Sequence, residues 1–168
     1  MSINKFKLNQ LGLVKMNTLI KREHDYAIRI CAYLAGNYQR GPIPLPHITQ
    51  KLFISLAFAN KIIRRLKKAG IVKTVQGKFG GVLLVRDPQT LSLMEIMEAV
   101  GFQGAVNACT IQPEICPFST HCQIHNFLVG LEQQLFSTLH QKPISDFAFT
   151  DKQLRKTKPS LNKATEVQ

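Results

Sequence analysis

The spacing of hydrophobic residues predicts a helix near the start of the chain. Over 25–37, Tyr26, Ile30, Tyr33 and Leu34 recur at helical spacing and therefore share one face. Glycine and asparagine end this segment, and a stretch rich in glycine and proline follows it as a linker. The first element is therefore expected to be a helix with one buried face.

Two further helices are predicted in close succession after this linker. A short one fits 47–53, with Pro46 at its first position, where a backbone N–H has no helical partner to lose. The next begins after Ser55, a good N-cap, and runs to about Ala69, with Gly70 as its terminator. Two short helices joined by a tight turn, the second strongly basic, form the helix-turn-helix pattern.

A hairpin is predicted directly after the basic helix. Residues 71–75 and 82–85 are β-prone, and they lie on either side of a glycine-rich tip at 76–81. A helix-turn-helix followed by a basic hairpin is a winged helix.

The last third of the chain predicts two more helices. Ser92 and Glu95 form a capping box that opens a helix ending at Gly101. After a loop, an apolar stripe marks a long helix that ends before Pro143. Since little chain remains to cover this stripe, we expect it to pack against the same helix of a second subunit. The stripe consists of Ile124, Phe127, Leu128, Leu131, Leu135, Phe136 and Leu139.

The expected fold class is mainly α with a small β-hairpin wing: a winged helix-turn-helix plus a long C-terminal dimerisation helix. Five parts are expected along the chain. They are a flexible leader (1–15), the winged helix-turn-helix (16–101), a cysteine-bearing loop (102–123), the dimerisation helix with the end of the fold (124–147), and a basic disordered tail (148–168).

Composition places the chain among globular proteins. Its 168 residues are 45% hydrophobic and 19% charged, which is enough to bury a core. No apolar run is long enough to span a membrane, and lysines interrupt any signal-peptide core near the start. The protein is therefore expected in the cytoplasm.

Charge is distributed unevenly along the chain, which has a net charge of +12. Residues 26–86 include eleven lysines and arginines and no acidic residue, whereas 87–151 include seven acidic residues and one lysine. A stretch as basic as the first repels itself unless a polyanion neutralises it, and the usual polyanion is nucleic acid. Double-stranded DNA is the favoured partner, because no aromatic platform for stacking RNA bases is predicted.

The basic helix offers different side chains along its length. Its first turn carries types suited to base edges in a major groove, and its later part carries cations suited to phosphates. The hairpin tip is expected to enter an adjacent minor groove. The alternative is a solvated basic helix in another kind of protein. The candidate DNA-binding residues are Ser55, Ala57, Asn60 and Lys61 for bases, Arg64, Arg65, Lys67 and Lys68 for phosphates, Gln76 and Lys78 at the tip, and Lys73 on the DNA backbone.

Three of the four cysteines lie within fourteen residues: Cys109, Cys116 and Cys122. In a reducing compartment such clustering indicates metal or redox chemistry rather than a disulfide framework. The spacing is too wide for the paired knuckles of structural zinc and suits a loop around a larger object, such as an iron–sulfur cluster. His125, one helical turn after Cys122, is a candidate fourth ligand. Zinc held by three cysteines and a histidine, or three free thiols, are the alternatives, and Cys31 is expected to be a core residue.

These motifs, in this order, resemble the Rrf-type bacterial transcription regulators, a group with IscR-, NsrR- and RirA-like members. The resemblance covers about 16–147. It is carried by DYAIR in the first helix, SLAFANKIIRRLKKAGIV in the basic helix, VQGKFGGVLL in the hairpin, SLMEIMEAV in the next helix, and CTIQPEIC followed by HC and H in the loop. It implies a winged helix-turn-helix homodimer that binds a DNA operator.

The resemblance also implies a cofactor and its ligands. In that family three loop cysteines hold a 2Fe–2S or 4Fe–4S cluster, which carries over to Cys109, Cys116 and Cys122. IscR-like members add a histidine three residues after the last cysteine, which matches His125. NsrR-like members add an aspartate from the opening helix of the partner subunit, which matches Asp25. This chain has both, and the DYAIR string favours Asp25, whose alternative role is to cap the first helix.

The sequence therefore predicts a DNA-binding transcriptional regulator, most often a repressor in this family, whose operator binding responds to an iron–sulfur cluster sensing iron, nitric oxide or redox state. Gain or loss of the cluster is expected to change the spacing of the two recognition helices. One alternative keeps the DNA-binding fold with a zinc or thiol-switch site. Another, a small iron–sulfur electron carrier, leaves the basic helix and hairpin unexplained. No catalytic constellation, small-molecule substrate or membrane association is predicted.

Overall fold

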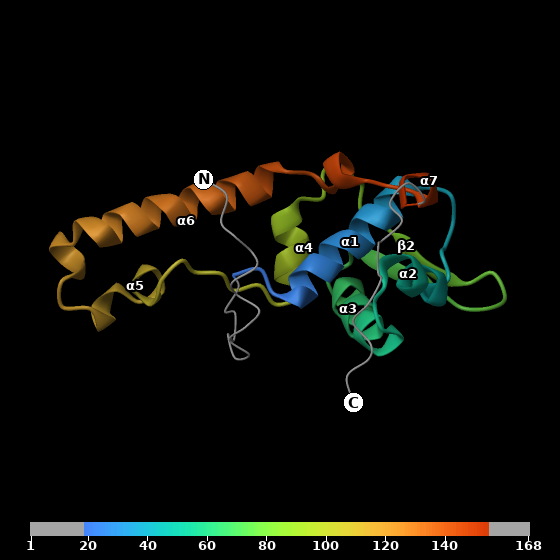
Figure 1. The fold of residues 1–168 in the computed structure, drawn as a ribbon, viewed down its shortest axis with the longest axis horizontal. Helices are drawn as coiled ribbons and strands as arrows, with labels where there is room; N and C mark the ends of the chain where they lie inside the picture. The colour runs from blue at the N-terminus through green and yellow to red at the C-terminus, as the bar shows by residue number, and fades with distance from the viewer. Residues whose placement is uncertain (1–18, 155–168) are drawn as a thin grey trace, which may run out of the picture.

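The computed structural model describes residues 19–154, which form mainly helices and one two-stranded hairpin (Figure 1). The expected leader (1–15) and most of the expected tail (155–168) lie outside the described residues. In chain order the elements are α1 (Arg22–Gly36), α2 (Leu45–Leu52), α3 (Leu56–Lys68), β1 (Val72–Val75), β2 (Gly81–Leu84), α4 (Leu93–Ala99), α5 (Ala108–Ile111), the 3-10 turns η1 (Pro113–Ile115) and η2 (Ser119–His121), α6 (Gln123–Gln141), η3 (Ile144–Phe147) and α7 (Asp151–Leu154).

Helix α1 lies at the centre of the core. Its apolar residues are buried around most of its circumference, because α2, α3, α4, β2 and η3 all contact it. The helix begins at Arg22, three residues earlier than predicted. His24 at its third position accepts the Lys21 backbone N–H through Nδ1 at 3.1 Å. Capping boxes normally use glutamate or glutamine there, so the sequence carried no recognised start signal.

The helix-turn-helix is confirmed, with one adjustment to its first helix. Helix α2 begins at Leu45, so Pro46 is its second residue rather than its first. Neither position has an intrahelical partner for its N–H, and proline fits both. Helix α3 begins after Ser55, whose hydroxyl accepts the Phe58 N–H at 3.4 Å. It stops before Gly70, which has a left-handed φ of +70°.

The predicted hairpin is also present. Strands β1 and β2 are antiparallel, in a register that pairs Val72 with Leu84 and Val75 with Gly81. Ile43, in the α1–α2 connection, extends the pairing through two backbone hydrogen bonds with Val82, of 2.9 and 2.8 Å. The Ile43 backbone passes so close to Gly81 that no Cβ would fit there, which accounts for this glycine.

Helix α4 opens with the predicted capping box: Ser92 accepts the Glu95 N–H at 3.2 Å, and Glu95 accepts the Ser92 N–H at 2.9 Å. The long helix α6 then projects beyond the body formed by α1–α4 and the hairpin, with the α5 segment running alongside it (Figure 1). No residue of α6 is buried, and Ile124 and Phe127 are 70% and 68% exposed.

The chain returns from α6 to the body through the C-terminal segment, residues 143–154. Ile144 is fully buried, and the Phe149 N–H donates to the Ala32 carbonyl of α1 at 3.3 Å. The Phe149 backbone lies so close to Gly36 that a Cβ there would not fit. Residues 148–154 were expected to belong to a disordered tail. They pack against the body instead, because Ala148, Phe149 and Leu154 supply apolar contacts with the core.

Candidate DNA-binding surface and cysteine loop

Helix α3 is amphipathic: one face is buried and the polar face is exposed to solvent. Ala59, Ile62, Ile63 and Leu66 are buried against the rest of the body. A helix turns about 100° per residue, so the side chains on the opposite side point outward. These exposed residues include most of those predicted from the sequence to read DNA. They are Ser55, Ala57, Asn60, Lys61, Arg64, Lys67 and Lys68.

Two of these lysines also contact side chains of neighbouring elements. Lys61 Nζ lies 3.6 Å from a Glu23 carboxylate oxygen of α1, while its side chain stays about half exposed. Lys67 Nζ donates to the Thr74 hydroxyl of β1 at 3.2 Å. Asn60, Arg64 and Lys68 are exposed, make no side-chain hydrogen bond or ion pair with another described residue, and form the centre of the outer face.

Arg65 departs from its predicted role as a phosphate contact. Its guanidinium turns toward the body, where Nη1 donates to the Val100 carbonyl and to Glu23 Oε2 at 3.3 Å. Arg65 follows Arg64 by one residue and therefore points about 100° away from it. The sequence grouped Arg65 with the other cations of this helix. The contact of its guanidinium with Val100 can be seen only from the position of α4 in the fold.

The hairpin tip carries the predicted Gln76 and Lys78, both exposed. Beside them Phe79 is 84% exposed, and the Lys78 ammonium lies 5.7 Å from the centre of its ring. The sequence analysis did not select Phe79. It could have been found from the sequence, because an aromatic residue inside a glycine-rich hairpin tip has no core position available to it.

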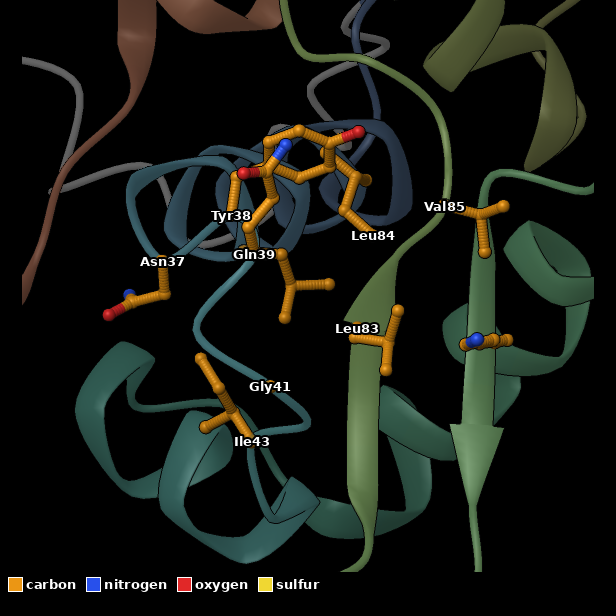
Figure 2. Close-up of a pocket in the computed structure, with 10 residues that line it drawn as sticks. Asn37, Tyr38, Gln39, Gly41, Ile43, Leu83, Leu84 and Val85 are labelled. Atoms are coloured by element: carbon orange, nitrogen blue, oxygen red, sulfur yellow. The ribbon is translucent and has the colours of Figure 1, made fainter.

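Lys73 lies on the face of the hairpin that is turned away from α3. Side chains alternate along a strand, and its neighbour Thr74 points to α3 through the bond to Lys67. Lys73 instead lines a pocket of about 330 Å³ with the α1–α2 connection and the outer face of β2 (Figure 2). The polar Asn37 and Gln39 lie at this pocket together with the aliphatic Ile43 and Leu83. The predicted contact of Lys73 with the DNA backbone is not supported by this placement.

The three clustered cysteines all lie in the connection between α4 and α6, and all are partly exposed thiols. Cys109 is in α5, Cys116 follows η1, and Cys122 is the N-cap of α6, where its Sγ accepts the His125 N–H at 3.4 Å. Among the described residues, no three histidine, cysteine or acidic side chains gather closely enough to hold a metal ion. The structure thus brings the cysteines onto one loop without bringing their thiols together.

Glu132 attaches this loop to α6. One carboxylate oxygen, Oε2, accepts the Val106 N–H at 2.9 Å and the Thr110 hydroxyl at 2.6 Å. These two donors lie on either side of Cys109 in the sequence. The first cysteine is therefore fixed to the middle of the long helix, although the sequence alone gave no sign of Glu132.

The two candidates for a fourth ligand lie in different places. Asp25 is inside α1 and pairs with Arg29 at 2.8 Å on the surface, so it does not cap the helix. His125 lies in the first turn of α6, and its Nδ1 is buried without a hydrogen-bond partner among the described residues. An unpaired imidazole nitrogen one helical turn from the Cys122 thiol, with two further thiols on the same loop, offers the kinds of donor that an iron–sulfur cluster takes.

Cys31 is a core residue, as predicted. It is fully buried in α1, and burial raises the pKa of its thiol. A thiol that stays protonated in an apolar core neither binds metal nor reacts. Cys31 therefore provides a natural comparison for the three loop cysteines.

A helix-turn-helix with a basic hairpin and a long, exposed additional helix is the arrangement of winged-helix transcriptional regulators. The chain belongs to the Rrf2 family, described as iron-dependent transcriptional regulators, which matches residues 20–149. Accordingly it is a DNA-binding regulator of transcription and not an enzyme. None of the helices in the described part of the chain is long and apolar enough to cross a membrane.

Individual relatives agree with this assignment. The chain is 33% identical over 115 residues to the HTH-type transcriptional regulator IscR of Xenorhabdus nematophila, covering 68% of this chain and 69% of that protein. It is 28% identical over 144 residues to protein aau3 of Rhizobium meliloti, covering 85% and 88%.

Solved structures share the fold. CymR of B. subtilis, titled the global cysteine regulator, superposes with a TM-score of 0.64 at 21% identity, over 77% of this chain and 95% of its own. IscR of T. potens superposes with a TM-score of 0.61 at 18% identity, over 92% and 96%.

Proposed function

We propose that this protein is a homodimeric transcriptional regulator, acting as a repressor, whose operator binding is controlled by an iron–sulfur cluster. The proposed ligands are Cys109, Cys116 and Cys122, completed by Asp25 of the partner subunit or by His125. The observation that carries the proposal is the position of the three thiols in the one loop that joins α4 to α6.

The contacts at the two ends of this loop explain why it suits a sensor. At its start, Phe102 packs edge-on against His24 of α1, with ring centres 5.2 Å apart, and against Phe136 of α6, at 6.2 Å. At its end, Cys122 caps α6. A change in the loop therefore acts on the DNA-binding body and on the long helix together.

A bound cluster would supply a centre that responds to iron supply, oxidation and nitric oxide, since its thiolate ligands are labile to these agents. The protein's own contribution is to hold the ligands. Glu132 fixes the Cys109 segment to α6, and the Cys122 sulfur accepts a backbone N–H at the start of the same helix.

The homodimer is supported by the exposed apolar stripe of α6. Ile124, Phe127 and Leu131 are exposed along one side of the helix, whereas Phe136 and Leu139 turn to α4. An exposed stripe of this length marks an interaction surface. A second copy of α6 fits it by symmetry, and two DNA-binding bodies would then face two half-sites of one operator.

The test is to purify wild-type protein and two cysteine variants without oxygen. We expect the wild type to be brown, with iron and acid-labile sulfide. Cys116→Ala should lose both colour and iron yet stay folded, because Cys116 is partly exposed and its thiol makes no hydrogen bond with another described residue. Cys31→Ala, a matched control in the core, should keep the wild-type iron content. A Cys116→Ala protein that kept its iron and its operator affinity would contradict the ligand assignment.

A thiol switch is the second candidate, favoured by one observation: the three thiols are partly exposed and lie apart in the structure. A colourless wild-type protein whose operator affinity changes on oxidation, and is restored by a thiol reductant, would establish this function instead. A colourless protein containing zinc would indicate a structural metal site.

A further inference from the structure

Arg65 links the recognition helix to another part of the molecule. It lies on α3, yet its guanidinium reaches across to the end of α4, where it donates to the Val100 carbonyl. The same Nη1 atom lies 3.3 Å from Glu23 Oε2 of α1. One side chain therefore joins three helices, and its side chain is 37% exposed.

The position of the Val100 carbonyl makes this contact favourable. Val100 follows the last residue of α4, where the final carbonyls of a helix have no partner within it. A cation there satisfies a free acceptor and opposes the negative end of the helix dipole. The Glu23 carboxylate neutralises the same guanidinium, so Arg65 is held by two kinds of interaction.

The residues after Val100 are the base of the cysteine loop. Gly101 has a left-handed φ of +93°, and the Phe102 N–H donates back to the Met97 carbonyl at 3.0 Å. This tight turn sets the direction in which the loop leaves α4. Arg65 therefore holds the recognition helix at the point from which the cysteine-bearing chain departs.

We propose that Arg65 is a positioning residue that fixes the recognition helix to the base of the cysteine loop and contacts no phosphate. Its neighbour Arg64 points outward and makes the phosphate contact. The inference rests on the proposed function in one respect: where the loop holds a cluster, Arg65 makes the orientation of α3 depend on it.

The first test compares Arg65→Gln with Arg64→Gln in cluster-free protein on a mixed-sequence duplex. Each phosphate contact contributes about 0.9 to the slope of log affinity against log salt. Arg64→Gln is expected to reduce the slope by about that amount, whereas Arg65→Gln leaves it unchanged. An equal reduction in both variants would make Arg65 a phosphate contact and overturn the proposal.

The second test measures amide hydrogen exchange at Gly101 and Phe102 in the same proteins. Arg65→Gln is expected to speed exchange at both amides, and Arg64→Gln to leave it unchanged. Glu23→Gln weakens the link from α1 and should speed the same two amides. Glu23 also lies 3.6 Å from Lys61 Nζ, so the salt dependence of this variant reports on both cations and does not separate them. Wild-type exchange rates at Gly101 and Phe102 in Arg65→Gln would overturn the proposal.

The third test asks whether the link transmits the state of the loop. On a duplex selected by the wild-type protein, the ratio of affinities between cluster-loaded and cluster-free protein should fall toward one in Arg65→Gln. It should keep the wild-type value in Arg64→Gln. A wild-type ratio in Arg65→Gln would refute the transmission. If the wild type binds no cluster, the proposed function fails, while the first two tests still decide the role of Arg65.

Discussion

At the scale of single residues, Asp151 makes the most concentrated set of contacts outside the candidate site. Its carboxylate accepts the Tyr33 hydroxyl at 2.7 Å and lies 3.1 Å from Lys51 and 3.5 Å from His47. The Tyr33 hydrogen bond, with help from Lys51 and His47, lowers the pKa of Asp151 against the opposing effect of burial. This residue thereby attaches the C-terminal segment to both α1 and α2.

Replacing Asp151 with asparagine should lower stability in a pH-dependent way. Because its pKa is lower in the folded than in the unfolded protein, the carboxylate stabilises the fold above the unfolded value of about 3.9. That contribution is lost as the pH falls through the depressed pKa. We expect Asp151→Asn to lower the free energy of unfolding by about 1 kcal/mol at neutral pH, and by less in acid, in urea titrations.

Asp146 offers a matched control for this measurement. It forms a surface ion pair, at 3.5 Å, with Lys142, four residues earlier in the chain. Exposed pairs of this kind contribute little, so Asp146→Asn should change stability by less than about 0.5 kcal/mol. A loss in Asp151→Asn that stayed constant from neutral to acid pH would show that the carboxylate charge is not responsible.

At the scale of secondary-structure elements, two lysines that look alike in the sequence lie on different surfaces of the molecule. Lys68 lies on the outer face of α3, whereas Lys73 lies beside the pocket on the far face of the hairpin. Only Lys68 shares with Asn60 and Arg64 the outer face of α3, which we propose binds DNA.

We therefore expect Lys68→Gln to weaken binding to duplexes of any sequence and to reduce the salt slope by about 0.9. Lys73→Gln removes the same charge and serves as the control, with a slope close to that of the wild type. Fluorescence anisotropy over a series of salt concentrations measures both. Equal losses in the two variants would show that net charge, and not the position of Lys68, governs binding.

Local signals explain which elements the sequence could predict. Ser55, Ser92 and Gly70 are standard helix boundary residues, and the start of α3, the start of α4 and the end of α3 were predicted accordingly. The start of α1 was misplaced because a histidine occupies the position where glutamate is usual. In the candidate site, periodicity selected the outer face of α3 correctly.

The sequence could not predict side-chain orientations that depend on tertiary contacts. Arg65 turns to Val100, which is thirty-five residues away in the chain, and Glu132 binds the loop across twenty-six residues. Helical periodicity predicts which side of a helix a residue occupies. It does not predict which other part of the fold packs against that side. Residues 148–154 were missed for a related reason, since nothing in so short a segment reveals that Phe149 packs on α1.

At the scale of the whole molecule, α6 packs on the body near its C-terminal end and projects away from it toward its first residue (Figure 1). Its first end is reached through the cysteine loop, and after its last residue the Lys142 carbonyl accepts the Leu93 N–H of α4 at 2.9 Å. The exposed apolar residues of α6, Ile124, Phe127 and Leu131, are free to receive the second subunit proposed above.

A charge placed on this stripe should prevent dimerisation. Leu131→Glu puts a carboxylate in the proposed interface, where it would be buried without a partner. We expect a monomer in sedimentation velocity and weaker operator binding. Gln133→Glu adds the same charge about 200° around the helix and should remain a dimer. A dimeric Leu131→Glu protein would place the subunit contact elsewhere.

The attachment of the C-terminal segment to α1 also has a consequence for folding. Tyr33 and Asp151, which hydrogen-bond to each other, are separated by 118 positions in the chain. Contacts between such distant residues slow folding, because a long loop must close before they form. During synthesis, the surface of α1 around Ala32 and Gly36 stays uncovered until nearly the whole described chain has been made. Residues 143–154 therefore complete the core that the first helix begins.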